Sequence, residues 1–243
     1  MENSNGKNGG SDPAMGDDLD DVDDTSVEDG EIEIELEPMP LEIAELCAAL
    51  VRFVSTKYKF ELDFSPDTLS VLDAYVRDAR KDVQAKPESL DLLQASIGAY
   101  FGEVIRRVYC GMWTLRSATP AKTSGEGSPA EGTLADEDSY GARGWRLGFQ
   151  HIFLEFNPVG AAREWLLEDH ADGWAANFRV KTEDELALSA RIDVIPPVEE
   201  DAFFLPTTRC DVLELVGDFL IDRRRQRGET TLFTRAHYLS LPN

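Results

Sequence analysis

The chain reads IGAYFGEVIRR over residues 97–107, followed by GMW over residues 111–113. Apolar side chains recur at helical spacing through this stretch, which predicts one long helix over residues 87–108 and a strand directly after it. Gly98 and Gly102 are four residues apart and therefore lie on one face of that helix. Because each glycine costs a helix about 1 kcal/mol relative to alanine, this face is expected to let another part of the chain, or a partner, approach closely.

Two interpretations of the glycine face remain open. In the first, the face lines a groove with Glu103, Arg106 and Trp113 at its rim, and these residues contact a partner. In the second, the face is a site of tight helix-on-sheet packing, which the sustained apolar periodicity favours. Glu103 and Arg107 are four residues apart, in the order that suits a helical ion pair. Coordinates can decide between the two, because packing requires that side chains cover Gly98 and Gly102.

The rest of the chain alternates between helical and extended patterns. Helices are predicted over residues 41–54, 66–79, 158–173 and 208–227, and another directly after a capping-box pattern at 182–185. Extended segments are predicted at 59–64, 112–115, 145–149, 152–156 and 192–195. Ser65-Pro66 and Asn157-Pro158 each combine a capping side chain with a proline in the first turn, which is typical of a helix start. The mixture predicts an α+β fold in which helices pack on a small, mostly antiparallel sheet.

The last predicted helix carries both an apolar stripe and a basic end. We expect it to bury Val212, Leu215, Val216 and Phe219, which recur at helical spacing. Four arginines close the helix, at positions 223, 224, 225 and 227. They complement the negative end of the helix dipole, which is the favoured explanation; binding of phosphate or of an acidic partner is the alternative.

An acidic segment precedes the predicted domain. Residues 1–38 contain 14 acidic side chains, one lysine and no aromatic residue, a charge of −13 out of −23 for the whole chain. Such a composition cannot bury enough apolar surface to offset the entropy of ordering, so it predicts a disordered tail. The tail either keeps the protein in solution or attracts a partner with a basic surface.

One part of the tail alternates strictly between acidic and apolar residues, over residues 31–37. An extended backbone would place Ile32, Ile34 and Leu36 on one face and four carboxylates on the other. This segment could add to an exposed sheet edge of a partner, with the three apolar residues contacting it. Alternatively it is the first edge strand of the same domain, with charge on its outer face.

The remaining 205 residues are predicted to form a single α+β domain, 39–243, interrupted by a flexible insertion at 117–144 that is rich in Gly, Ser, Pro, Ala and Glu. The three cysteines are far apart, which argues against a disulfide framework. No run of residues approaches the length and apolar character of a membrane span, so a cytoplasmic protein is expected. The negative charge argues against nucleic-acid or anionic-membrane partners.

Motifs of catalysis and cofactor binding are missing from the sequence. There is no nucleophile elbow, phosphate loop, dinucleotide fingerprint or zinc-protease pair. His151 and Glu155 would share a face of an extended segment, but two ligands are too few for a metal site. The sequence therefore predicts no catalytic, cofactor-binding or metal-binding residue.

Three short motifs resemble a known group of bacterial proteins. Residues 62–69 (LDFSPDTL), 98–104 (GAYFGEV) and 111–113 (GMW) are similar to the domain-of-unknown-function family DUF3806 and related sets. The resemblance covers roughly residues 60 to 160. It implies a compact α+β domain in a bacterial cytoplasm and brings no catalytic residues with it.

Three hypotheses for the function follow. The first is a non-enzymatic interaction or regulatory protein that docks another protein with the help of its acidic arm. The second is an immunity-type charge mimic that neutralises a basic, nucleic-acid-binding protein, and it predicts binding that weakens steeply with salt. The third is an enzyme with an unusual site near Glu103, which requires a concave polar pocket there. The sequence leaves the oligomeric state open.

Overall fold

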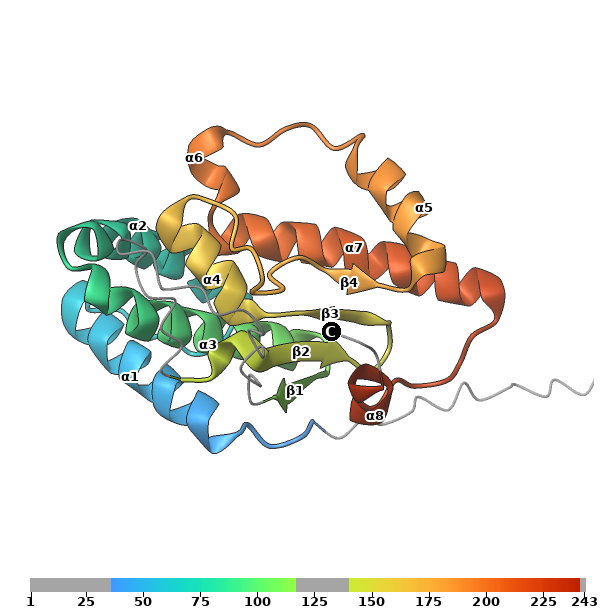
Figure 1. Ribbon diagram of the computed structural model, residues 1–243, viewed down its shortest axis with the longest axis horizontal. Coiled ribbons are helices and arrows are strands. Elements are labelled where there is room, and N and C mark those ends of the chain that lie inside the picture. The colour runs from blue at the N-terminus through green and yellow to red at the C-terminus, as the bar shows by residue number, and fades with distance from the viewer. Residues whose placement is uncertain (1–35, 117–139, 241–243) are drawn as a thin grey trace, which may run out of the picture. The chain divides into compact units, whose positions relative to one another are not determined.

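The computed structural model describes residues 36–116 and 140–240, and Figure 1 labels its elements. The helices are α1 (Leu41–Tyr58), α2 (Leu69–Ala85), α3 (Leu90–Val108), α4 (Pro158–Leu167), α5 (Thr182–Ile192), α6 (Glu200–Phe203), α7 (Pro206–Arg227) and α8 (Arg235–Leu239). The strands are β1 (Gly111–Leu115), β2 (Trp145–Phe149), β3 (Leu154–Phe156) and β4 (Arg179–Val180). Short 3-10 helices, Pro66–Thr68, Pro87–Ser89 and Ala142–Gly144, precede α2, α3 and β2. The predicted α+β fold is confirmed.

The strands form one antiparallel sheet in the order β1-β2-β3-β4. Trp113 pairs with Leu147, which pairs with Phe156, so these three buried side chains share one face of the sheet. That face meets α3, where the rings of Phe101 and Phe156 lie 6.4 Å apart in an edge-to-face arrangement. The sheet is thus small and antiparallel, as predicted.

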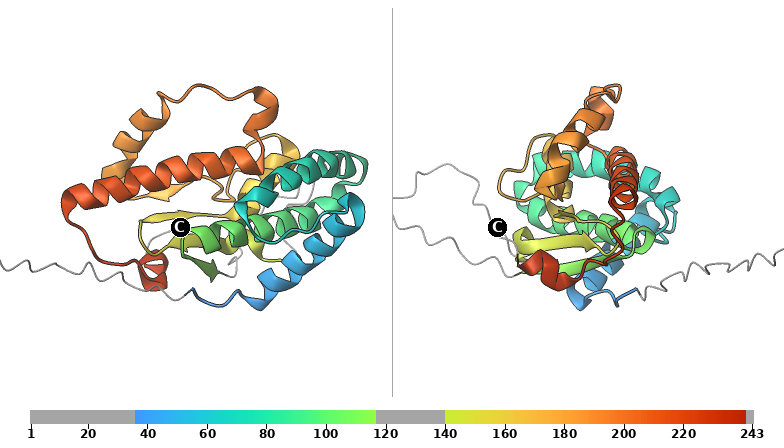
Figure 2. Two further views of the ribbon diagram at one scale, coloured as in Figure 1. Left: turned by 180° about the vertical axis from the view of Figure 1, so that it is seen from behind. Right: turned by 90° about the vertical axis from the view of Figure 1, so that its right-hand side faces the viewer.

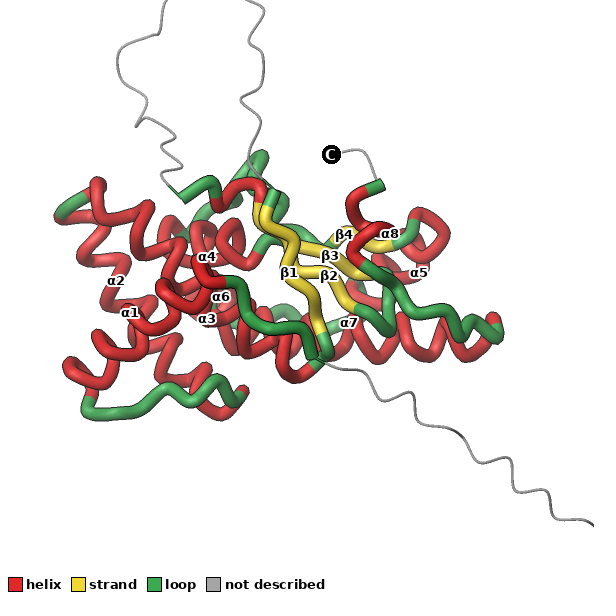
Figure 3. Tube along the Cα trace, turned by 90° about the horizontal axis from the view of Figure 1, so that it is seen from below, coloured by secondary structure: helices red, strands yellow, loops and turns green. Residues whose placement is uncertain are grey.

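The opposite face of the sheet is covered in part by α8, which the sequence patterns did not indicate. The ring of Tyr238 lies against Gly148 of β2, where an added Cβ would come within 2.8 Å of the ring. The Tyr238 hydroxyl donates to the carbonyl oxygen of Phe149 at 2.7 Å and accepts from its N–H at 3.0 Å. Figure 3 shows α8 beside the strands.

Helix α3 is the centre of the helical layer. Thirteen of its 19 residues are buried, and α1, α2 and α4 all contact it. Figure 2 shows these four helices gathered on one side of the molecule, with α7 running past the sheet. The long helix that the sequence predicts over residues 87–108 therefore occurs, with its first turn in the 3-10 form.

The predicted extended segments at 59–64 and 192–195 are not strands. Lys59 and Phe64 have positive φ angles of 56° and 65°, which interrupt an extended path. In the second segment the N–H of Ile195 donates to the carbonyl oxygen of Ile192 at 2.9 Å, so the chain turns directly after α5. In the first segment only Leu62 is buried, and in the second Ile192 and Val194 are exposed, so neither segment has the buried face of a strand.

Helix α4 begins as predicted, since the Asn157 side chain accepts from the N–H of Val159 at 2.9 Å. It ends at Leu167, before the predicted end at 173, because Glu168 takes the left-handed conformation with φ of 53°.

The capping box predicted at 182–185 does not form. Helix α5 begins at Thr182 itself, and its N-cap residue is Lys181, which makes no side-chain capping bond. A capping box occurs instead at α8, between Thr234 and His237.

The predicted tail and insertion are described only at their ends. Ile32 and Ile34, with the rest of residues 1–35, lie outside the described residues, as do residues 117–139. At the end of the predicted insertion, Ala142–Gly144 form a 3-10 helix, and the Ala142 carbonyl oxygen accepts from the Asn157 side chain at 2.9 Å. The flexibility of the insertion at 117–144 stays a prediction.

Helix α7 buries a different face from the one predicted. Its buried residues include Leu213, Val216, Gly217, Leu220 and Arg224. The predicted core positions 212, 215 and 219 are only half-buried. The shift of one position corresponds to a rotation of about 100° around the helix axis. Val216 is buried as predicted, whereas Val212 and Phe219 pack only at the edge of the core.

Candidate functional site

The glycine face of α3 is a packing surface. A Cβ added at Gly98 would lie 2.4 Å from the Cα of Val159 in α4, and one at Gly102 would lie 2.4 Å from the indole of Trp113. Trp113 is buried against Gly102, and its ring meets that of Trp145 edge-to-face at 6.5 Å. The groove that was one interpretation of this face is therefore wrong, because α4 and β1 fill the space.

Glu103 and Arg106 are also buried, and they form an ion cluster inside the protein. Glu103 is 0 % exposed and accepts from Arg106 Nε and Nη2, both at 2.7 Å, and from Arg107 Nε at 2.9 Å. Burial alone raises the pKa of Glu103, but the hydrogen bonds and charges of the two arginines outweigh it and hold the pKa below its usual value. The predicted pair with Arg107 is confirmed. Neither Glu103 nor Arg106 is placed at a rim where a partner could touch it.

The third donor of Arg106 holds the end of the acidic arm. Nη1 of Arg106 donates to the carbonyl oxygen of Glu37 at 2.6 Å, and the Glu37 side chain forms a salt bridge with Arg235 of α8. Leu36 is 38 % exposed, and residues 36–40 form neither helix nor strand. Within the described residues, the arm therefore begins from a fixed point at Glu37, and the proposed edge strand has no counterpart at residues 36 and 37.

Exposed apolar side chains concentrate in another region, the α5–α6 segment, residues 182–203. Five of the fourteen exposed large apolar residues in the described part of the chain lie there: Leu186, Ile192, Val194, Val198 and Phe203. Leu186 is 84 % exposed and Val194 is 69 % exposed. Single exposed apolar residues are normal, but a concentration of this kind in one segment indicates an interaction surface.

The α5–α6 segment arches over α7, as Figures 1 and 2 show. An open groove of about 700 Å³ lies between them, hereafter the acidic groove. Its lining residues are Arg191, Asp211, Glu214, Leu215, Asp218, Phe219 and Asp222. Four carboxylates against one guanidinium make it strongly negative, while Leu215 and Phe219 give it an apolar floor. Both side chains are half-buried, and that of Phe219 also packs against the core.

One end of the arch is fixed by a buried carboxylate. Asp184 in the first turn of α5 is 2 % exposed, and it accepts from Arg227 Nη1 at 2.8 Å and from Arg223 Nε at 3.2 Å. Burial raises the pKa of Asp184, yet the bonds to these arginines outweigh burial and lower it.

The other end is fixed to α2. Arg80 donates to the carbonyl oxygen of Phe204 at 2.7 Å, and Asp73 accepts from the Thr207 hydroxyl at 2.6 Å. Because both ends are held, the walls of the acidic groove keep a defined spacing.

The arginine cluster that ends α7 is part of this frame. Arg223 and Arg227 hold Asp184, while Arg224 is buried and donates to the carbonyl oxygens of His151 and Thr231. Arg225 pairs with Asp222 at 3.4 Å. Specific tertiary contacts, and not the helix dipole alone, therefore account for the cluster.

The acidic groove was not identified from the sequence, although one signal was present. Residues 211, 214, 218 and 222 recur at helical spacing and form an acidic stripe on α7. Assigning Leu215 and Phe219 to the core hid the fact that the stripe has apolar neighbours at the surface.

Among the helices of residues 36–116 and 140–240, none has both the length and the apolar character of a bilayer span. Comparisons with protein-family models, with curated proteins and with solved structures found no match. The resemblance of residues 60 to 160 to DUF3806 therefore stays a prediction.

Proposed function

We propose that this protein is a non-enzymatic docking protein that binds a basic, amphipathic segment of another protein in the acidic groove. The observation that carries the proposal is the acidic stripe of α7 beside the half-buried Leu215 and Phe219, together with the exposed apolar side chains of the α5–α6 segment. Basic side chains of a partner would pair with the carboxylates, while its apolar side chains would cover the exposed ones. The resemblance to DUF3806 implies a bacterial cytoplasm as the setting.

The acidic arm has a supporting role in this proposal. Residues 1–38 carry a charge of −13, and a field of that sign attracts a cationic partner and speeds encounter. The arm acts before contact, whereas the acidic groove supplies the specific contacts. Removal of the arm is therefore expected to slow association more than it speeds dissociation.

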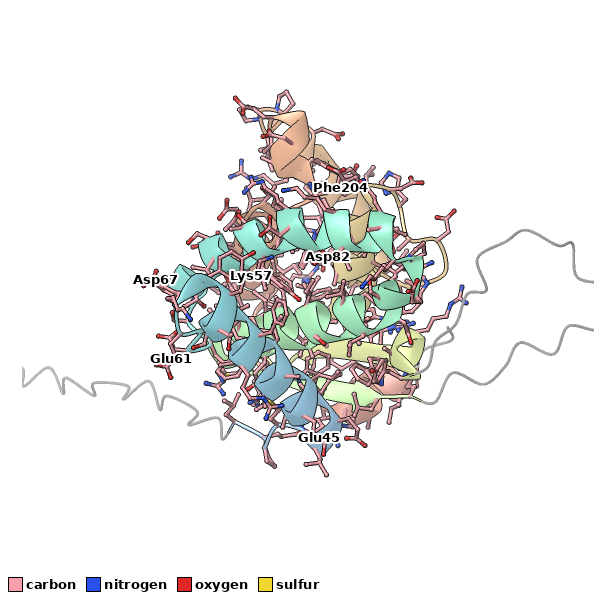
Figure 4. All side chains as sticks on the ribbon, turned by 90° about the vertical axis from the view of Figure 1, so that its left-hand side faces the viewer. Glu45, Lys57, Glu61, Asp67, Asp82 and Phe204 are labelled. Atoms are coloured by element: carbon pink, nitrogen blue, oxygen red, sulfur yellow. The ribbon has the colours of Figure 1, made fainter. Side chains whose placement is uncertain are left out.

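A matched pair of charge reversals tests the proposal. The groove variant carries Glu214→Lys and Asp218→Lys; the control carries Glu45→Lys and Asp82→Lys. The control positions are exposed on α1 and α2, and Figure 4 shows them. Both variants change the net charge equally. We expect wild type and control to capture proteins that the groove variant does not capture.

The same variants should be titrated with a synthetic helical peptide in which pairs of lysines alternate with pairs of leucines. Amide chemical shifts of the protein are the readout. We expect changes at the α5–α6 segment and at α7 in wild type and control, and much weaker ones in the groove variant. Equal capture and equal shifts in all three proteins would exclude the acidic groove as the docking site.

The charge-mimic hypothesis is a special case that the same samples distinguish. It requires that a captured partner binds nucleic acid and that nucleic acid competes with this protein for it. Burial of Leu215 and Phe219 predicts instead a complex that salt weakens without abolishing, since apolar contacts are not screened. The enzyme hypothesis placed its site near Glu103, where the structure has close packing, and we do not propose it.

A further inference from the structure

The sheet face that α8 covers in part carries a cluster of charged side chains. Arg146 alternates with Leu147 along β2 and therefore points away from the helical layer, as does Glu155, which pairs with Gly148 across the strands. Glu155 also pairs in register with Arg179 of β4, and Arg179 Nη2 donates to Glu155 Oε2. Arg116 follows β1, with Nη2 3.8 Å from Glu155 Oε1.

These side chains line a small cavity of about 100 Å³. Arg116, Arg146, Glu155, Asn177 and Arg179 contribute its polar groups, with Phe156 and Ala175 completing the wall. Three guanidinium groups and one carboxylate therefore line the cavity, in a chain whose net charge is −23. At about 30 Å³ per water, the space suits a group the size of about three waters.

Two side chains at the cavity have unused hydrogen-bonding capacity. Among residues 36–116 and 140–240, Arg146 makes its hydrogen bonds through Nη1 alone, to the carbonyl oxygens of Arg143 and Trp145, both at 2.7 Å. Its Nε and Nη2 groups therefore remain as donors toward a ligand. Glu155 is 3 % exposed, and its Oε1 is buried without a hydrogen bond in the described residues. A buried acceptor without a donor destabilises the folded protein, and a donor from a ligand would remove that cost.

We infer that this cavity binds a small oxyanion that carries a hydroxyl group, namely a protonated phosphate, free or as a phosphomonoester. The fork of Arg146 matches the oxygens of a phosphate, and its positive charge suits an anion. The hydroxyl donates to Oε1 of Glu155. A fully ionised oxyanion such as sulfate has no proton to donate and would place an oxygen against that carboxylate, so the site rejects it.

The test uses the full chain and titrates inorganic phosphate, sulfate and glycerol 3-phosphate at pH 6, with calorimetry and amide chemical shifts as readouts. We expect saturable phosphate binding with shifts at Arg146 and Glu155, and sulfate binding at least tenfold weaker. Glycerol 3-phosphate binding more tightly than phosphate identifies a monoester as the ligand; weaker binding identifies the free ion. Equal affinity for sulfate and phosphate, or no saturable phosphate binding, overturns the inference.

Two variants and a control locate the site. Arg146→Gln is expected to lower phosphate affinity at least tenfold, and Arg225→Gln, at an exposed arginine of α7, is expected to leave it unchanged. Glu155→Gln should let sulfate bind as well as phosphate, because an amide can turn its NH2 toward the anion. A purely structural role for Glu155 would not change this selectivity. If Arg146→Gln folds and binds phosphate as wild type does, the inference is wrong.

Discussion

Arg106 Nη1 donates to the carbonyl oxygen of Glu37 at 2.6 Å, so the buried end of α3 holds the chain at the point where the acidic arm ends. Two other nitrogens of the same guanidinium hold Glu103. The arm and the central helix therefore share one ion cluster, and the position at which the arm is cut decides whether that cluster stays intact.

Truncations on either side of Glu37 are expected to behave differently. A variant lacking residues 1–35 keeps the Glu37 carbonyl, and we expect its free energy of unfolding to equal that of the full chain. A variant lacking residues 1–37 leaves a donor of buried Arg106 without its acceptor, a loss of about 1.5–3 kcal/mol for a charged group. Urea unfolding at pH 7 measures both values. If the two truncations are equally stable, the contact contributes nothing.

Glu103→Gln is expected to lower the free energy of unfolding at neutral pH. It is also expected to make that free energy change less between pH 2 and 7. Because the folded pKa of Glu103 is lowered, its stabilising effect is present above the unfolded value of about 4.3 and is lost as the pH falls through the folded pKa. Breaking a buried ion pair costs about 3–5 kcal/mol at neutral pH. Unfolding free energies measured from pH 2 to 7 should therefore converge for wild type and variant at the acidic end. Parallel curves would contradict the role of this carboxylate.

Two glycine-to-alanine changes in helices are expected to have opposite signs. At Gly98 the new methyl group would lie 2.4 Å from the Cα of Val159, and overpacking of this kind costs about 1–3 kcal/mol. At Gly217 the nearest side-chain atom is 3.9 Å away, so alanine fits and gains about 0.5–1 kcal/mol in helix propensity. Thermal unfolding of both variants gives the comparison. Stabilisation at both positions would mean that α3 and α4 are not in close contact.

The sequence was informative where local chemistry determines the structure. The cap at Asn157, the glycine face of α3 and the pair between Glu103 and Arg107 all follow from residue types at fixed spacing, and all are present. The short elements β4 and α8 could not be predicted, because their two and five residues carry no periodic signal. They are held by tertiary contacts, such as the pairing of Glu155 with Arg179.

The acidic groove was missed for a related reason. Assigning the core face of α7 assumed that its arginines lie outside, whereas Arg224 is buried and bonds to the carbonyl oxygens of His151 and Thr231. A buried arginine depends on acceptors that lie far away in the sequence. No local pattern could therefore show that Leu215 and Phe219 are only half-buried.

Tyr238→Phe tests whether α8 stabilises the sheet. The hydroxyl of Tyr238 serves the N–H and carbonyl groups of Phe149, and its removal leaves the buried N–H without an acceptor, at a cost of about 1–3 kcal/mol. The ring still covers Gly148, so the fold is retained. Amide hydrogen exchange is expected to speed up at Phe149 in particular, together with a lower free energy of unfolding. Tyr140→Phe, at an exposed tyrosine, is the matched control and should change neither value. If both variants resemble wild type, the hydroxyl of Tyr238 does not stabilise the sheet, because loss of the hydrogen bond that protects an amide in the folded state speeds its exchange.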